Sequence, residues 1–413
     1  MGGIGNRLAG PRRAVLGGLA GSAAASFGGI ARAAGPGFAR PPLVPMRLTR
    51  DQLIDVKCCI RPLRAAGPNL STEIVGDRLI IHNYGHGGSG WSLSWGCAEV
   101  AVGKAMSVLP TSIAVVGCGI IGLTSAIMAQ RAGLKVTIYA RELLLRTRSF
   151  RASGSFTPGS RIALTVPAGP KFADEWEAMA RFSWKMMRTY LGLPGKAVEF
   201  ADSYAVSDKP ITRRVWTPDP AITTAWTPGG LPLQHTEFAH LDERIRDIVP
   251  QSAPVPAEEN PFATPYVNRT SQMHFNFTSY AQVMLQEFFE RGGRYVIRNF
   301  HSPAELARLP EKVVIHATGY AARDLWRDNT VIPVRGQTGW LVPQTEANYA
   351  VRMGPYLAMS KADGVVIMNN SPVEMGDMLG VGDSTELPDP GPIEQAMATL
   401  AGVFAPRAAG GAA

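Results

Sequence analysis

Two glycine-rich stretches hold the residues of this chain that are best suited to chemistry. The first, IIHNYGHGGSGWSLSWGCA, runs from Ile80 to Ala98 and packs five glycines, two histidines, a tyrosine and two tryptophans between His82 and Gly96. Neither helix nor strand propensity favours this mixture. Glycine is used where a ligand approaches the backbone too closely for a Cβ atom, or where φ is positive. We therefore expect a ligand to lie against this stretch.

The second stretch belongs to the segment TSIAVVGCGIIGLTSAIMAQRAGLKVTIYARE, which begins at Thr111. Its apolar pattern predicts a buried strand over 113–116, a glycine turn and a helix that ends at Gly133. A second strand is predicted over 135–140. The segment therefore reads as one βαβ unit.

The glycine spacing in this unit is that of a dinucleotide fingerprint. Gly117 permits a tight turn, Gly119 lets the backbone approach a pyrophosphate at the helix N-terminus, and Gly122 lets helix and strand pack closely. Glu142 lies twenty residues beyond Gly122, near the position of a ribose-binding carboxylate. The unit predicts a dinucleotide site, but it does not separate FAD from NAD.

Composition indicates a globular protein with about two or three domains. The 413 residues are 46% hydrophobic and 18% charged, with a formal net charge of +8. Four arginines of that total lie within residues 1–33, which hold no acidic residue, so removal of this segment would leave +8 − 4 = +4. The chain has no long Lys/Arg run, and we expect no nucleic-acid partner.

The N-terminal residues 1–33 resemble an export signal. Arg12 and Arg13 precede an uncharged stretch from Ala14 to Ala31 that contains five glycines and only two leucines. The small-residue pattern that ends at Ala33 suits a signal peptidase. Twin arginines are typical of the export route for folded proteins, so we expect a periplasmic or otherwise exported protein.

The four cysteines form neither a disulfide framework nor a metal site in this interpretation. Cys58 and Cys59 are adjacent, Cys97 stands alone, Cys118 sits inside the glycine fingerprint, and no CxxC spacing exists. We interpret all four as small buried residues. Folding around a cofactor before export is consistent with this pattern.

The rest of the chain alternates helices and strands irregularly. We predict helices over 174–191 and 279–290, a capping box at 302–305 that opens a short helix, and a strand over 312–317. The apolar stripe of the first helix is interpreted as core. Residues 207–266 are rich in Pro and Thr and are expected to form long surface connections.

The first glycine-rich stretch resembles the signature of the D-amino-acid oxidase family of FAD enzymes, which includes D-aspartate oxidases. Upstream, IRPLR over 60–64 is similar to that family's arginine-proline segment. Downstream, SGSFTP, HATGYAARDL, PVRGQ and GPYLAMSKADGVVIM are similar to its flavin-domain and substrate-domain stretches. The resemblance covers the chain from Val56 to near residue 404.

The order of these segments differs from the usual family members, in which the arginine-proline segment and the signature close the chain. Here they precede the βαβ unit, which suggests a circular permutation. The stretch from Gly103 to Thr111 would then be the new linker. Loss of function through rearrangement is the alternative, and the intact signature argues against it.

The resemblance implies an α/β fold, in which a Rossmann-type FAD-binding domain accompanies a second, antiparallel-sheet substrate domain of α+β type. The predicted parts are a twin-arginine signal (1–33), a discontinuous FAD-binding domain (56–165 plus 305–330) and a substrate-binding domain (166–304 plus 331–385). A C-terminal helix (386–405) and a tail (406–413) follow.

The resemblance also implies the chemistry, in which FAD accepts a hydride from the substrate Cα atom and the protein positions the substrate. Arg61 is the expected ligand of the substrate carboxylate, because a guanidinium forks onto a carboxylate with two parallel bonds. A surface ion pair is the alternative, which the apolar context CCIRPL argues against. Tyr356 is expected to meet the same carboxylate, or else to be a structural tyrosine. Gly88 is expected to reach the substrate ammonium group.

The residues expected to hold FAD belong to the two glycine-rich stretches and to later segments of the chain. They are Gly87, Gly88, Gly90, Trp91, Ser92, Gly117, Gly119, Ile120, Ile121, Gly122, Arg141, Glu142, Arg148, Ser149, Gly154, Ser155, Thr318 and Gly319. His86 is expected to be a structural residue beside the flavin, and no metal is expected.

Several positions depart from the family pattern. Arg352 stands where many relatives have a second active-site tyrosine, Asn369 and Asn370 replace a double glycine, and Arg141 precedes a displaced acidic residue. Arg352 could favour an acidic substrate side chain.

The expected function is oxidative deamination of a D-amino acid, with oxygen as acceptor. The alternatives are a dehydrogenase that uses a quinone or carrier, a non-catalytic flavoprotein and an NAD(P) reductase, the last opposed by the signature. The expected partners are a small-molecule D-amino acid, oxygen or another electron acceptor, and the twin-arginine export machinery; a homodimer is left open.

Overall fold

The computed structural model describes residues 43–212, 237–371 and 377–404. These belong to one of the two units into which the chain divides, Leu43–Ala413. The predicted signal at 1–33 and the predicted tail at 406–413 lie outside the described residues.

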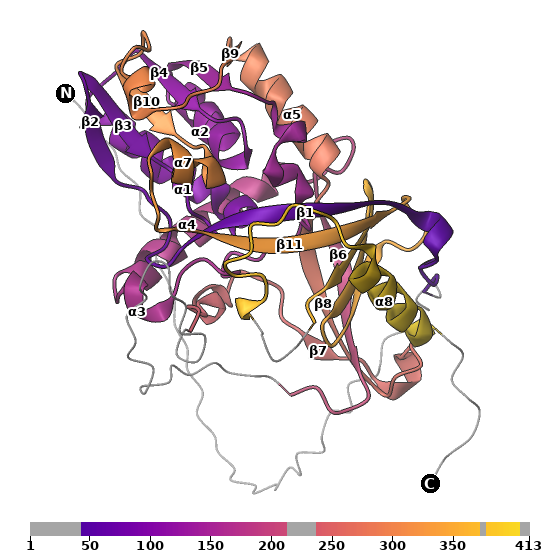
Figure 1. The fold of residues 1–413 in the computed structure, drawn as a ribbon. Helices are drawn as coiled ribbons and strands as arrows, with labels where there is room; N and C mark the ends of the chain where they lie inside the picture. Colours follow the sequence, from indigo (N-terminus) through magenta and orange to yellow (C-terminus); the bar gives the residue numbers. More distant parts are fainter. Residues whose placement is uncertain (1–42, 213–236, 372–376, 405–413) are drawn as a thin grey trace, which may run out of the picture. The chain divides into compact units, whose positions relative to one another are not determined.

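A six-stranded sheet forms the first layer, and its strand order is β2-β3-β10-β4-β5-β9 (Figure 1). Five neighbouring strands run parallel, and β2 pairs with β3 in antiparallel fashion. Central strands read as continuous apolar runs because helices cover both faces of such a sheet. The bounds are β2 Thr72–Val75, β3 Arg78–His82, β4 Ser112–Val116, β5 Lys135–Ala140, β9 Arg294–Ile297 and β10 Val313–His316.

A second sheet has the order β1-β11-β14-β13-β12-β6-β8-β7 and is antiparallel except where β12 pairs with β6. The two expected layers, a parallel Rossmann-type sheet and a mainly antiparallel second sheet, are therefore confirmed. The bounds are β1 Leu53–Arg64, β6 Val198–Ser207, β7 Ala253–Pro254, β8 Tyr266–Phe275, β11 Val331–Leu341, β12 Tyr349–Met353, β13 Tyr356–Lys361 and β14 Gly364–Asn369.

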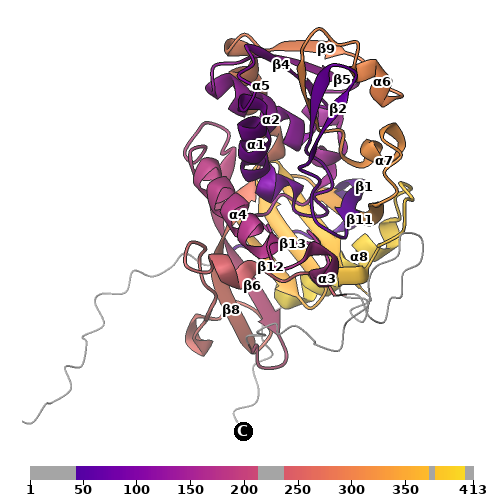
Figure 2. The same ribbon diagram turned by 90° about the vertical axis from the view of Figure 1, so that its left-hand side faces the viewer.

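The helices follow the predicted pattern closely. The predicted strand 135–140 has the bounds of β5, and the helices predicted over 174–191 and 279–290 correspond to α4 and α5 (Figure 2). The predicted C-terminal helix is shorter and corresponds to α8. The bounds are α1 Gly90–Met106, α2 Ile120–Arg131, α3 Thr165–Ala168, α4 Phe172–Arg188, α5 Phe277–Glu290, α6 Pro303–Leu306, α7 Ala322–Leu325 and α8 Pro390–Ala401.

The predicted capping box opens α6 only in part. The side chain of Ser302, the N-cap residue, makes no cap hydrogen bond. Glu305 reaches back instead to the backbone N–H of His301, at 2.9 Å. The helix therefore begins at the predicted place with one half of the box.

The front segment of the chain contributes to both sheets. β1 pairs antiparallel with β11, whereas β3 lies between β2 and β10. This corrects two predicted boundaries, because β1 belongs to the second sheet and β9 to the first. The predicted linker from Gly103 is also shorter, since α1 continues to Met106.

One hydrophobic core joins the two sheets. Ile113 and Val115 of β4 belong to the same buried cluster as Phe275 of β8 and Trp340 of β11. The far face of the second sheet packs against α8 through a separate cluster that includes Ile393. Among the described residues, no helix is long and apolar enough to span a membrane.

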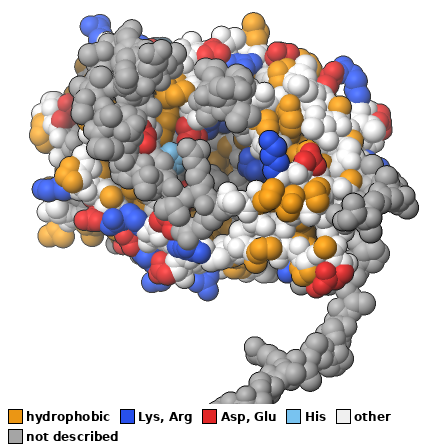
Figure 3. Space-filling model, turned by 90° about the horizontal axis from the view of Figure 1, so that it is seen from below, with side chains coloured by type: hydrophobic (Ala, Val, Ile, Leu, Met, Phe, Trp, Pro, Cys, Tyr) orange, Lys and Arg blue, Asp and Glu red, His pale blue; other side chains and the backbone are white. Residues whose placement is uncertain are grey.

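Charges of both signs lie interspersed on the face shown in Figure 3, where Lys and Arg side chains alternate with Asp and Glu side chains.

All four cysteines are free. Cys58, Cys97 and Cys118 are buried as expected, but Cys59 is partly exposed. No group of metal-ligating side chains occurs within the described ranges.

We predict opposite effects of alanine at two glycines of α1. A Cβ atom on Gly96 would lie 2.2 Å from the carbonyl oxygen of Met179 in α4, whereas Gly103 has open space around it. Gly96→Ala should therefore separate α1 from α4 and lower the free energy of unfolding by about 1–3 kcal/mol. Gly103→Ala, the matched control, should raise it by about 0.5–1 kcal/mol. Urea unfolding measures both, and equal effects would contradict the close helix contact.

Candidate cofactor and substrate site

A cavity of about 600 Å³ lies at the carboxyl ends of the five parallel strands. Ligands of open α/β sheets bind at this edge, where connections leave neighbouring strands in opposite directions. Here α2 leads from β4 to β5, while β10 flanks β4 on the other side. Each loop that follows a parallel strand supplies lining residues, for example Gly88, Gly119, Glu142, Phe300 and Gly319.

The glycine fingerprint forms one wall of this cavity. Gly117 has a φ of +109°, and a Cβ atom there would lie 2.4 Å from the carbonyl oxygen of Ala317. Gly122 is packed behind the wall, where a Cβ atom would lie 2.1 Å from the Gly117 carbonyl oxygen. Gly119 and Ile120 line the cavity at the start of α2, so the positive end of the helix faces it. The roles expected for the glycines therefore have matching geometry.

The predicted residues after β5 lie at the same cavity. Arg141 and Glu142 both line it and form an ion pair of 3.5 Å. Ser149 accepts a hydrogen bond from the backbone N–H of Ile120 at 3.1 Å. Thr318 and Gly319, which follow β10, also line the cavity.

The front segment contributes residues to the wall of the same cavity. Gly87, Gly88, Gly90 and Trp91 line the same cavity as the fingerprint. Because β3 and β4 both pair in parallel with β10, their carboxyl ends meet at one edge although β3 precedes β4 in the chain. Two stretches that the sequence separates are thus brought together.

The double glycine of the signature is required by the protein's own backbone. A Cβ atom on Gly87 would lie 1.8 Å from the carbonyl oxygen of Arg161, and one on Gly88 would lie 2.6 Å from Oγ of Ser160. Gly87 also has a positive φ of +53°. These glycines therefore allow a second loop to pack against the signature, and the positive φ of Gly87 is the second of the two reasons expected for glycine here.

Arg61 presents a guanidinium to the cavity without a protein counterion. Its side chain is partly buried, and this partial desolvation lowers its pKa. Within the described part of the chain, neither a hydrogen bond nor an ion pair of Arg61 is found. Gly336 provides the space, since a Cβ atom there would lie 2.3 Å from Nη2 of Arg61. A cation in this setting needs an anionic partner, because an unpaired buried charge is strongly unfavourable.

Two further arginines of the cavity share one carboxylate. Arg148 and Arg151 both pair with Glu386, and the Arg151–Glu386 distance is 2.8 Å. All three residues line the cavity. Glu386 comes from the segment before α8, far from the arginines in sequence, so the C-terminal part of the chain closes this side of the wall.

Two buried polar atoms of the cavity wall have no protein partner within the described residues. They are Nε2 of His86 and Oδ1 of Asn83. Burial lowers the pKa of His86 to about 3, so its ring is neutral at physiological pH. Both atoms are inaccessible to solvent in this structure, so they lie behind the surface of the cavity.

Besides Gly122, three more predicted cofactor residues do not line the cavity. Ser92 accepts a hydrogen bond from the backbone N–H of Thr157 at 2.8 Å. Ser155 forms a β-bridge with His274, and a Cβ atom on Gly154 would lie 2.8 Å from Nζ of Lys361. In this structure these residues stabilise the chain behind the cavity.

Tyr356 and Arg61 are not brought together. Tyr356 packs against the hydrophobic cluster on the far face of the second sheet, whereas Arg61 faces the cavity. The geometry corresponds to the structural alternative for this tyrosine.

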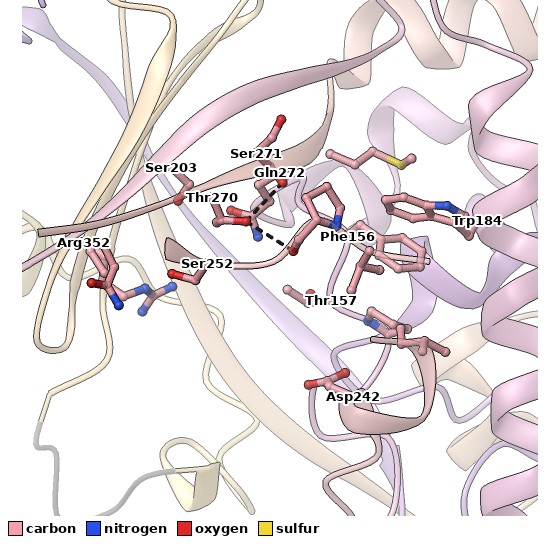
Figure 4. A pocket seen from close by; sticks show the side chains of 17 residues that line it. Phe156, Thr157, Trp184, Ser203, Asp242, Ser252, Thr270, Ser271, Gln272 and Arg352 are labelled. Atoms are coloured by element: carbon pink, nitrogen blue, oxygen red, sulfur yellow. Dashed lines mark hydrogen bonds between the residues drawn. The ribbon is translucent and has the colours of Figure 1, made fainter. Parts of the chain in front are cut away.

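Arg352 lines a different pocket, which has a volume of about 350 Å³. In this pocket Arg352 lies near Ser252, and Asp242 and Trp184 lie on the other side of the labelled side chains (Figure 4). Asn369 and Asn370 make structural hydrogen bonds, to Pro392 and Pro355 respectively. None of these three departures from the family pattern reaches the cavity wall.

Sequence reasoning missed several residues that line the cavity. Arg298, Phe300 and His301 follow β9, and the strand-end rule could have identified them once β9 was placed in the parallel sheet. Tyr84 lies inside the quoted signature and was not singled out. Glu386 carried no recognisable signal.

Comparison with known proteins identifies a family. Residues 112–409 match the model of the DAO family, described as FAD dependent oxidoreductase. A D-amino-acid oxidase of Rubrobacter xylanophilus is 41% identical over 63 residues, 15% of this chain and 19% of that protein. A D-amino-acid oxidase of Dictyostelium discoideum is 46% identical over 55 residues, 13% of this chain and 16% of that protein. These matches span less than a fifth of each relative.

Two amino-acid enzymes are among the solved structures that match part of this chain. An L-amino acid deaminase from Proteus vulgaris, with its specific insertion deleted, has 18% identity and a TM-score of 0.46, and the match covers 72% of this chain and 75% of that one. A glycine oxidase from Geobacillus kaustophilus has 12% identity and a TM-score of 0.39, with coverages of 62% and 70%.

Trp91 should be needed for cofactor binding, and Trp95 should not. The indole of Trp91 lines the cavity and donates to the backbone carbonyl of Ser149 at 2.7 Å, which anchors the loop that carries Arg148. Trp91→Phe removes this bond and should weaken FAD binding on the order of tenfold, since one such bond contributes about 1 kcal/mol. Trp95→Phe, whose lost partner is Tyr280, is the matched control in the same helix. FAD titration of the apoprotein followed by fluorescence decides, and unchanged FAD affinity of Trp91→Phe would contradict the anchoring role.

Proposed function

The chain belongs to the DAO family of FAD-dependent oxidoreductases, and on this premise we propose that it oxidises a D-amino acid. The proposed reaction removes a hydride from Cα and a proton from the amino group, and water hydrolyses the resulting imino acid to a 2-oxo acid and ammonia. Oxygen is the final acceptor of the two electrons and becomes hydrogen peroxide. The reaction needs a carboxylate-binding cation beside a flavin site, and the cavity offers both features.

The observation that carries this proposal is the Arg61 guanidinium in the cavity wall. It is partly buried, has no counterion within the described residues, and lines the same cavity as Gly88 and Gly119. A substrate carboxylate would supply the missing negative charge, and the planar fork would fix its orientation.

The cavity also suits FAD itself. The fingerprint glycines and the N-terminus of α2 would hold the pyrophosphate, and Glu142 lies at the end of β5, where a ribose hydroxyl would bind. When bound, FAD supplies the hydride acceptor, and the protein supplies orientation and exclusion of water.

The preference for the D enantiomer rests on the relatives. The two relatives described above are named D-amino-acid oxidase. A third relative, from Cryptococcus neoformans, is named D-aspartate oxidase; it is 44% identical over 52 residues, which are 12% of this chain and 13% of that protein. A dehydrogenase that passes electrons to a quinone or carrier would share this cavity. Formation of hydrogen peroxide in air distinguishes the oxidase, and a flavin that no amino acid bleaches would indicate a non-catalytic flavoprotein.

Arg61 variants test the proposed carboxylate site. Arg61→Lys keeps a charge but loses the fork, so it should weaken substrate binding, and Arg61→Ala should weaken it further. Loss of one partner of a buried charge pair is unfavourable by about 3–5 kcal/mol, equivalent to several hundredfold in binding. The measurement is anaerobic flavin reduction by one good D-amino acid at low concentration.

The matched control for this measurement is Arg64→Lys. Arg64 lies on the same strand but pairs with Asp328 at 3.4 Å and does not line the cavity. The Arg64→Lys variant should leave the rate of flavin reduction unchanged. Equal rates for the wild type and both Arg61 variants at low substrate concentration would assign Arg61 a structural role instead.

We also propose that residues 1–33 direct export of the folded, FAD-loaded protein through the twin-arginine route. The support is the sequence pattern alone. Replacing Arg12 and Arg13 by lysine should leave a yellow precursor in the cytoplasm, whereas Arg7→Lys should be exported normally. Cell fractionation measures this, and normal export of the double variant would exclude the twin-arginine route.

A further inference from the structure

A chain of hydrogen-bonded side chains connects the solvent to the cavity. Glu73 on β2 lies at the outer end, with a side chain that is 43% exposed. Its Oε1 lies 2.8 Å from Nε2 of His82, and Nδ1 of His82 lies 3.0 Å from Nδ1 of His316. Nε2 of His316 lies 2.7 Å from Oγ1 of Thr318, which lines the cavity.

The backbone holds this chain in place. His82 and His316 are register partners on the parallel strands β3 and β10, so their side chains leave the sheet on the same face. Both rings are almost fully buried. The indole of Trp326 stacks on His316 with ring centres 4.1 Å apart and donates its N–H to Glu73. Tyr84 packs against both imidazoles.

Both imidazoles are neutral in this environment. Burial lowers the pKa of His82 and that of His316, and the second imidazole lowers the pKa of His316 further. The charged groups that act on His82 are Glu73, Asp328 and Arg64. Because two Nδ1 atoms face each other, one must donate and the other accept.

This leaves two arrangements of the protons. When Glu73 is a carboxylate, it accepts from Nε2–H of His82, Nδ1 of His82 accepts from Nδ1–H of His316, and Nε2 of His316 accepts from the Thr318 hydroxyl. When Glu73 is protonated, every bond reverses, and the Thr318 hydroxyl is free to donate into the cavity. Neither arrangement contains an imidazolium ion.

We propose that Glu73, His82, His316 and Thr318 form a proton relay between the solvent and the cofactor cavity. An outward transfer breaks the X–H bond of a water or ammonium donor in the cavity and forms an O–H bond on Thr318. The hydroxyl proton of Thr318 passes to Nε2 of His316, the Nδ1 proton of His316 to Nδ1 of His82, and the Nε2 proton of His82 to Glu73. One proton has moved outward, and the reverse sequence moves one proton inward.

The relay can move one proton in each direction, and this number matches the proposed function. Its role in catalysis rests on that proposed function. Loss of a hydride from Cα of an amino acid is accompanied by loss of one proton from its ammonium group. Two-electron reduction of oxygen to hydrogen peroxide takes up one proton with each hydride. A relay that carries one proton out and one proton in therefore returns to its starting arrangement after one turnover.

Histidine tautomers test the relay without any substrate. In protein labelled with ¹⁵N-histidine, NMR at pH 8 should show His82 protonated at Nε2 and His316 protonated at Nδ1. Glu73→Ala removes the acceptor that fixes this order, so both rings should become mixtures of tautomers, whereas Glu175→Ala, at an exposed carboxylate of α4, should change neither ring. An imidazolium ion at pH 8, or protons at Nε2 of both rings, would overturn the relay.

Kinetics test the cavity end. Thr318→Val removes the hydroxyl and should slow flavin reduction at saturating D-amino acid on the order of tenfold or more, as loss of a proton-transfer group does. The rate is measured on FAD-saturated protein, because Thr318 also lines the cofactor cavity. The half-saturating substrate concentration should stay unchanged, and Thr318→Ser should restore the rate. An unchanged rate for Thr318→Val, or a loss confined to FAD affinity, would overturn the proposal. If no amino acid reduces the wild-type flavin, the proposed function fails and the tautomers alone decide the relay.

Discussion

Parallel pairing of β3 and β4 with the shared strand β10 is the constraint on which the cavity depends. Parallel strands end at the same edge of a sheet, so each added strand brings its following loop to that edge. Through β3, the front of the chain brings the signature glycines to the same cavity as the fingerprint. The same register aligns His82 with His316 and so sets one imidazole against the other. A shift of one residue would send the two rings to opposite faces.

The cavity wall is dominated by positive charge that the protein only partly neutralises. Arg148 and Arg151 share the single carboxylate of Glu386, and Arg61 has no counterion in the described residues. In a medium of low dielectric constant such an imbalance is unfavourable until an anion enters. The positive end of α2 adds to the same field.

How far the sequence could predict the structure depended on the range of the interactions involved. The βαβ unit was predictable, and β5 has the predicted bounds, because its strand, turn and helix are set by neighbouring residues. The face of the sheet on which Tyr356 lies was not predictable. Alternate residues of a strand point to opposite sides, and a resemblance aligns Tyr356 with a family position without showing which side its ring faces. Glu386 could not be found, because it meets Arg148 across 238 positions of the chain. His82 and His316 were both in quoted motifs, yet their contact follows only from the strand order.

The place of the front segment in both sheets has a consequence for synthesis of the protein. Cys58 of β1 contacts Gln337 of β11 across 279 positions, and His82 meets His316 across 234. The strands that leave the ribosome first therefore stay unpaired until their partner strands are made near the end of translation. Local units such as β4–α2–β5 can form earlier, because closing a short loop loses less entropy. Until β10 and β11 emerge, β1 and β3 expose unpaired edges that favour aggregation. Completion of the cavity is thus a late step in the synthesis of this chain.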